Sequence, residues 1–169
     1  ISYSTNYGID TGEWYVGGFV GEIYSNTNMA MAISDSTNDG SVTGSKKYTG
    51  GFVGGISGTN PNMTMTILNS TNNGKVNGWA CVGGLVGKIA NTSMMMAFFN
   101  FSNDGTVTGS GSSVGGFAGI ISFNKKTVIN IHNSSNNAIV SGSNKYVGGF
   151  VGQIDWNNNI TMTFLDSAN

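Results

Sequence analysis

The chain has 169 residues, of which only 9% are charged, and seven lysines against eight acidic residues leave a net charge of −1. This balance gives no electrostatic footprint for nucleic acid or for an anionic membrane surface. No stretch approaches the roughly 18 consecutive apolar residues of a membrane-spanning helix, so the sequence predicts no membrane span.

In chain order, the first predicted element is a segment that consists of an asparagine, a turn and a short strand. The copies of this segment span 36–44, 70–78, 101–109 and 134–142, and a degenerate first copy spans 4–12. Asn-Gly and Asp-Gly pairs at 73–74, 39–40 and 104–105 indicate the turn, because these residues tolerate a positive φ. The Gly-x-Val-x-Gly stretch behind the turn predicts the strand.

The second element is a glycine-pair segment, Val16-Gly17-Gly18-Phe19-Val20-Gly21 in the first copy. The first glycines of its five copies lie at residues 17, 50, 83, 115 and 148. A glycine pair before an apolar run indicates a bend or a close approach of two backbones. The large apolar residues behind the pair recur at fixed phase and predict a buried strand.

The third element alternates large apolar residues with small or polar ones. It occurs at 29–33, 63–67, 94–98, 128–131 and 160–164. Alternation with a period of two residues is typical of a strand that buries one face. No apolar pattern with a helical period accompanies it, and glycine and asparagine are too frequent for helices.

The spacing of the glycine pairs predicts the architecture. The period is 33, 33, 32 and 33 residues, and a fixed period in this range is typical of stacked units that cannot bury an apolar face alone. We predict an all-β fold, a parallel β-solenoid of about five 33-residue coils with three short strands per coil. An antiparallel sandwich, or repeats that each split into two smaller coils, remain alternatives. The domain is a single repeat domain, 1–169, with repeats at approximately 6–37, 38–71, 72–102, 103–135 and 136–168.

One asparagine recurs at the same phase of every repeat. In a solenoid these residues lie above one another, and stacked side-chain amides can donate to the carbonyl oxygen of the neighbouring copy. A tolerance of asparagine for the left-handed backbone conformation would also explain the pattern. The predicted ladder consists of Asn6, Asn38, Asn72, Asn103, Asn136 and Asn169.

The Gly-Gly-Leu-Val-Gly kernel at 83–87 and the Asn-x-Gly-x-Val-x-Gly segment ahead of it resemble the GLUG-type repeats of secreted and surface-anchored proteins. The resemblance extends over nearly the whole chain. Phenylalanine replaces the leucine of the motif in four of the five copies, and the methionine-rich strand is no part of the motif. The resemblance implies an extracellular or cell-surface location and a role in surface attachment, and it implies no catalytic residues.

The residues that carry chemistry are few, so we expect no enzyme, no cofactor and no metal site. His132 is the only histidine and occupies the phase of Leu68 and Phe99, which excludes a histidine-based metal site or catalytic triad. Cys81 is the only cysteine, which excludes an internal disulfide. It shares the phase of Tyr15 and Tyr48, where we expect a partly exposed packing position.

Acceptor sequences for N-glycosylation occur about as often as chance gives in a chain this rich in asparagine, serine and threonine. Their placement beside the methionine-rich strands would let a glycan reach solvent. If the chain is secreted by a eukaryote, we expect some of these sites to carry sugar. The candidates are Asn62, Asn69, Asn91, Asn100, Asn133 and Asn159.

The sequence favours a structural extracellular fibre or surface-coat protein that assembles by end-to-end stacking of its coils. The repeats are monotonous, no polar cap is evident, and 4–6 matches 167–169, which suggests a filament subunit or a fragment of a longer chain. The expected partners are copies of the chain itself in a head-to-tail polymer. The alternative is a surface adhesin or carbohydrate-binding module, in which Trp14, Trp79 and Trp156 stack on sugars.

Overall fold

The computed structural model describes residues 1–24, 27–59, 62–90, 93–122, 125–155 and 158–169, and these residues contain strands and bends but no helix. The strands are β1 (Thr5–Asn6), β2 (Ile9–Gly17), β3 (Val20–Tyr24), β4 (Ala30–Ser34), β5 (Thr37–Asn38), β6 (Ser41–Gly50), β7 (Val53–Ser57), β8 (Met63–Asn72), β9 (Val76–Gly83), β10 (Val86–Ala90), β11 (Met94–Asn103), β12 (Val107–Gly109), β13 (Val114–Gly115), β14 (Ala118–Ser122), β15 (Lys125–His132), β16 (Ser135–Asn136), β17 (Val140–Gly142), β18 (Val147–Gly148), β19 (Val151–Asp155) and β20 (Asn158–Leu165).

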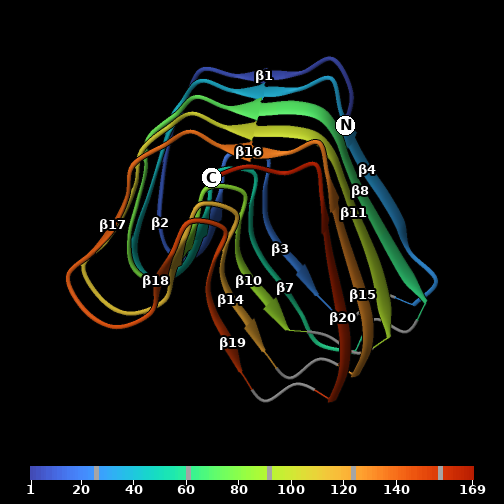
Figure 1. Cartoon of the computed structure of the whole chain (residues 1–169). Helices are drawn as coiled ribbons and strands as arrows, with labels where there is room; N and C mark the ends of the chain where they lie inside the picture. The colour runs from blue at the N-terminus through green and yellow to red at the C-terminus, as the bar shows by residue number, and fades with distance from the viewer. Residues whose placement is uncertain (25–26, 60–61, 91–92, 123–124, 156–157) are drawn as a thin grey trace.

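The described strands form three parallel sheets that run along the stack of coils (Figure 1). Sheet A has eight strands, β1, β4, β5, β8, β11, β15, β16 and β20. Sheet B has seven strands, β2, β6, β9, β12, β13, β17 and β18. Sheet C has five strands, β3, β7, β10, β14 and β19. Each coil therefore passes through all three sheets before the next coil begins.

Each strand pairs with its own counterpart one coil away, and the glycine pairs show this most directly. Their first glycines form one continuous column of parallel register partners, Gly17, Gly50, Gly83, Gly115 and Gly148. The chain is a parallel β-solenoid of about five coils with a spacing of roughly 33 residues and three strands per coil, as the period predicts. The parallel pairing excludes the antiparallel sandwich.

The coils turn at three corners, at each of which one residue adopts the left-handed conformation with φ between 46° and 66°. Such backbone costs about 1–3 kcal/mol at a residue other than glycine, and asparagine and aspartate tolerate it best. Corner I consists of Tyr15, Tyr48, Cys81, Ser113 and Tyr146. Corner II consists of Asn28, Asn62, Ser93, Lys126 and Asn159. Corner III consists of Tyr3, Asp35, Asn69, Asn100, Asn133 and Asp166.

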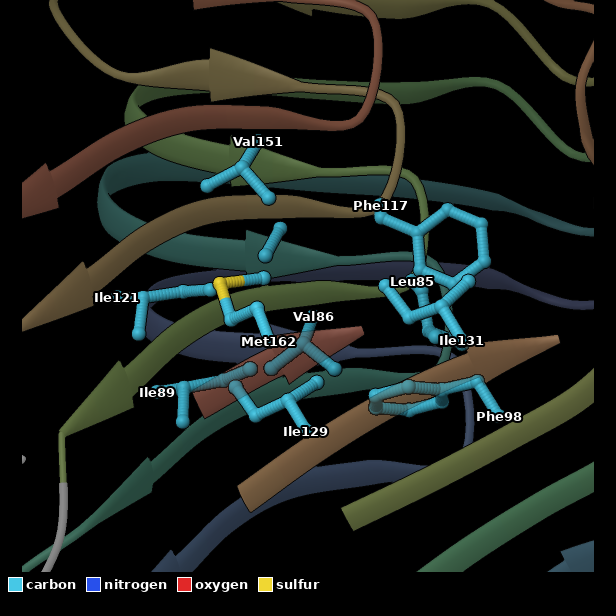
Figure 2. Close-up of a pocket in the computed structure, with 11 residues that line it drawn as sticks. Leu85, Val86, Ile89, Phe98, Phe117, Ile121, Ile129, Ile131, Val151 and Met162 are labelled. Atoms are coloured by element: carbon cyan, nitrogen blue, oxygen red, sulfur yellow. The ribbon is translucent and has the colours of Figure 1, made fainter. Parts of the chain in front are cut away.

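The main hydrophobic core lies between sheets A and C. Sheet A contributes buried residues such as Met65 and Phe98, and sheet C contributes Ile56 and Ile89. Figure 2 shows side chains of both sheets pointing into this space, Ile129 among them. A hollow of about 10 Å³ remains there, which has room for about one water molecule. The core is therefore packed and offers no ligand site.

A second, smaller core lies within sheet B, where Val76, Val82, Val107 and Val114 are buried against one another. Thr49 belongs to the same column, because Val82 is its register partner. Its Oγ1 is buried and has no hydrogen-bond partner among the described residues. An unpaired buried hydroxyl lowers the stability of the fold.

We expect Thr49→Val to raise the free energy of unfolding by about 1 kcal/mol, because valine has nearly the same shape and needs no partner. Urea denaturation followed by circular dichroism measures the change. Thr43→Val, at a half-buried position on the same strand, serves as the control and should change stability by less than about 0.5 kcal/mol. A loss of stability in Thr49→Val would show that the hydroxyl is paired in solution.

The Asn-Gly and Asp-Gly pairs bend the chain as predicted, but for a different reason. No member of these pairs has a positive φ. A Cβ on Gly74 would instead meet the carbonyl oxygen of Gly40 one coil away, and a Cβ on Gly105 would meet that of Gly74. Glycine is required at this position because successive coils approach too closely for a side chain.

Candidate functional site

The six asparagines of the predicted ladder are hydrogen-bonded in one continuous series. The Nδ2 of each donates to Oδ1 of the next at 2.7–2.8 Å, in the order Asn6, Asn38, Asn72, Asn103, Asn136 and Asn169. The central rungs Asn38, Asn72 and Asn103 are fully buried. The ladder therefore satisfies amides that would be costly to bury singly.

The ladder and the glycine pair form one packing unit. A Cβ on Gly51 would lie 2.6 Å from Oδ1 of Asn72, and a Cβ on Gly84 would lie 2.6 Å from Nδ2 of Asn103. The second glycine of the pair thus leaves the space that the amide fills. The second N–H of Asn72 donates to the carbonyl oxygen of Gly74 at 3.0 Å, so the amide also fixes its own turn.

The left-handed conformation does not explain the ladder. None of its asparagines is among the left-handed residues, so that alternative is wrong for this column. It does explain the asparagines of corners II and III, which are Asn28 and the five described candidates for glycosylation. Among the candidates, Asn91 lies outside the described residues, and the others are exposed at these corners: Asn62, Asn69, Asn100, Asn133 and Asn159.

Corner III also carries a short outer ladder on the surface. Nδ2 of Asn100 donates to Oδ1 of Asn69 at 2.9 Å, and Nδ2 of Asn69 donates to Asp35 at 3.1 Å. These bonds are exposed, so each contributes less than a rung of the buried ladder.

A lysine–aromatic cluster, consisting of Trp14, Tyr15, Tyr48, Lys46 and Lys88, lies at corner I of the first coils. The rings of Tyr15 and Tyr48 are 4.8 Å apart between centroids, and those of Trp14 and Tyr48 are 6.5 Å apart. Nζ of Lys88, on sheet C, lies 4.5 Å from the centroid of Tyr48 and 6.0 Å from that of Tyr15. Nζ of Lys46 lies 5.5 Å from the centroid of Trp14. The cluster thus joins sheets B and C by cation–π contacts.

The surroundings of Lys88 disfavour its charge. Burial lowers the pKa of its ammonium, and the neighbouring charge of Lys47 acts in the same direction, against the raising effects of Cys81 and Glu22. Burial likewise raises the pKa of the Tyr48 phenol. Lys46 differs, because its Nζ is 2.7 Å from the carboxylate of Glu13 in an exposed ion pair.

Cys81 occupies corner I, in the column of Tyr15 and Tyr48, as its phase predicts. Its side chain is buried, however, with 9% exposure, which corrects the expectation of a partly exposed position. Burial raises the pKa of the thiol to about 11, although Lys47 and Lys88 lower it. The thiol is therefore protonated and shielded at neutral pH, which argues against a nucleophile or a cross-link.

We expect the Cys81 thiol of the folded chain to react with iodoacetamide at pH 8 at least tenfold more slowly than the thiol of the urea-unfolded chain. As the pH rises, the two reaction rates should approach each other only when the pH nears the raised pKa of about 11. Because the unfolded thiol ionises at lower pH, this group's contribution to stability is present below about pH 8.5 and is lost as the pH rises through 11. Equal rates in the folded and unfolded chains would contradict the buried position.

The remaining candidates offer no reactive constellation. The His132 ring lies 5.1 Å from the ring of Phe99, and the two residues are register partners in sheet A. The described residues contain no group of three or more His, Cys, Asp or Glu side chains that could hold a metal ion. No helix of the length and apolarity needed to cross a membrane is found in the described ranges. Trp14 and Trp79 are both 49% exposed, and Trp156 lies outside the described residues.

Comparisons with models of known protein families, with curated proteins and with solved structures found no match to this chain. The resemblance to GLUG-type repeats therefore rests on the motif residues alone.

Proposed function

We propose that the chain is a structural protein of an extracellular fibre or surface coat, assembled by end-to-end stacking of solenoid coils. The observation that carries this proposal is that, within the described ranges, a sheet ends in strands that pair with a neighbouring coil on one side only. In sheet A these end strands are β1 and β20. A strand of a second copy in the same register would satisfy the open backbone groups.

The side chains of the last coil support the proposal. Ile154 is 54% exposed, whereas Ile89 in the same column is 2% exposed. Phe164 is 46% exposed, whereas Phe98 in its column is 2% exposed. A further coil would bury these side chains, and each square ångström of apolar surface removed from water contributes about 25 cal/mol. Edge pairing and apolar burial thus favour stacking together.

Light scattering and negative-stain microscopy over a range of protein concentrations test this function. We expect mass to grow with concentration and filaments to form. Ile154→Lys should block growth, because a lysine on the edge strand cannot be buried under another coil. Ile120→Lys is the matched control, since Lys88 occupies the register position beside it on the middle of sheet C. A monodisperse monomer at all concentrations would refute assembly by stacking.

We also propose N-linked glycans on corners II and III, in keeping with an extracellular location. The supporting observation is that the five described acceptor asparagines are exposed. Nδ2 of Asn69 and Nδ2 of Asn100 already donate within the outer ladder, and they lie one coil apart, about 4.8 Å. We expect secreted protein from a eukaryotic host to carry sugar at both Asn133 and Asn159 more often than at both Asn69 and Asn100 in the same molecule. Glycopeptide mass spectrometry measures the occupancy, and unmodified peptides at all sites would end the proposal.

A further inference from the structure

The lysine–aromatic cluster is not part of the repeated pattern that stacking requires. In the later coils corner I carries Ser113 and Tyr146, and the position of Lys88 on sheet C is taken by Ile120 and then Gln153. The cluster therefore belongs to the first three coils only. A feature confined to one part of a monotonous solenoid needs a reason other than the fold.

No ion pair of the Lys88 ammonium is found among the described residues, whereas Lys46 pairs with Glu13. The acidic residue that affects Lys88 is Glu22, which raises the pKa of Lys88 and also accepts a hydrogen bond from the hydroxyl of Ser57. A half-buried ammonium loses hydration, and the tyrosine faces replace only part of it. An external anion would restore the missing partner.

Trp14 supplies a flat apolar surface beside this charge. Its side chain is 49% exposed, and its ring lies next to Tyr48, which contacts Lys88. An exposed aromatic face adjoining an ammonium suits a ligand that has an apolar ring face and a negative substituent. Sugar rings that bear carboxylate or sulfate groups combine these two features, because their C–H face stacks on aromatic rings while the anion pairs with lysine.

We propose that the lysine–aromatic cluster binds an acidic saccharide, with the sugar ring on Trp14 and its carboxylate or sulfate at Lys88 and at Lys47, the register partner of Trp14 in sheet B. Nucleic acid is a poorer fit, because the chain has a net charge of −1 and no extended basic stripe. The site lies on the side of the solenoid, so it goes beyond the structural role and does not depend on stacking.

Isothermal titration of the full chain at low salt tests the proposal with four probes: a galacturonic acid oligomer, a heparin-derived oligosaccharide, a neutral cello-oligosaccharide and poly-glutamate. The two acidic saccharides distinguish carboxylate from sulfate recognition. We expect at least one of them to bind, and its affinity to fall as sodium chloride rises. Binding of poly-glutamate with equal affinity would identify an acidic peptide site and overturn the saccharide proposal.

The variants separate the two halves of the site. Lys88→Met keeps the apolar stem and removes the charge, and Trp14→Ala removes the ring; each should weaken binding of the acidic saccharide about tenfold, which corresponds to about 1.4 kcal/mol. The double variant Lys125→Ala, Lys126→Ala removes two exposed lysines from sheet A and should change affinity less than twofold. Equal losses in the cluster variants and this control, or no binding of either acidic saccharide, would overturn the proposal. Light scattering on the same samples reports stacking separately.

Discussion

Replacing Gly84 with alanine is expected to prevent the chain from forming its five stacked coils. A Cβ at this position would lie 2.5 Å from Cγ of Asn103 and would also meet the carbonyl oxygen of Gly116. Asn103 is held by its ladder bonds, and the N–H of Gly116 donates to the next coil, so neither residue can move aside as a flexible side chain would. We expect a loss of about 4 kcal/mol or more in the free energy of unfolding, above the usual range for a single substitution. Urea denaturation followed by circular dichroism measures it.

Gly8→Ala is the matched control for the Gly84 variant. A Cβ on Gly8 would meet only Oδ1 of Asn6, at 3.2 Å, and Gly8 is exposed on the first coil. The expected loss is about 1 kcal/mol or less. If both variants lose the same stability, close packing of the coils is not what selects glycine in the kernel.

The repeat period predicted the register, because in a parallel solenoid of constant spacing each residue lies beside its counterpart in the next coil. The column from Gly17 to Gly148 confirms this prediction. The ladder was also predictable, since asparagine recurs at one phase. The reason why the Asn-Gly turns need glycine could not be predicted, because the close approach of Gly74 to Gly40 exists only when the coils are stacked.

Corner I could not be predicted from local preference. Tyr15 and Tyr48 are aromatic residues, for which a positive φ is unfavourable. Tertiary packing imposes it: a Cβ on Gly54 would lie 2.6 Å from the backbone nitrogen of Val16, so the corner packs directly against a position of β7 that has no side chain. The lysine–aromatic cluster was missed for a similar reason, because Lys88 and Tyr48 are 40 positions apart and belong to different sheets.

Replacing Asn72 with alanine is expected to cost about 4 kcal/mol of the free energy of unfolding. The substitution leaves three buried groups unpaired: the Nδ2 of Asn38, the Oδ1 of Asn103 and the carbonyl oxygen of Gly74. Each unpaired buried group costs about 1–3 kcal/mol, and relaxation around the smaller side chain recovers part of the sum. Thermal and urea denaturation followed by circular dichroism give the loss.

Asn73→Ala, at the next residue, tests whether burial of the ladder is the cause. Nδ2 of Asn73 also donates to a side chain one coil away, to Asp39 at 2.8 Å, but this bond is exposed. Water replaces such a bond when it is removed, so the loss should stay below about 0.5 kcal/mol. Equal losses at the two positions would mean that the buried ladder contributes no more than a surface bond.

Asn72→Asp distinguishes lost hydrogen bonds from lost shape, because aspartate fills the same space but at neutral pH only accepts hydrogen bonds. It can still accept from Asn38, whereas Oδ1 of Asn103 and the carbonyl of Gly74 then face a buried negative charge. We expect a greater loss than for alanine at pH 7. Burial raises the pKa of such a carboxyl, so the penalty should shrink as the pH falls and the acid regains a donor proton. A variant as stable at pH 7 as the unsubstituted chain would show that shape, rather than the direction of donation along the rungs, holds this column together.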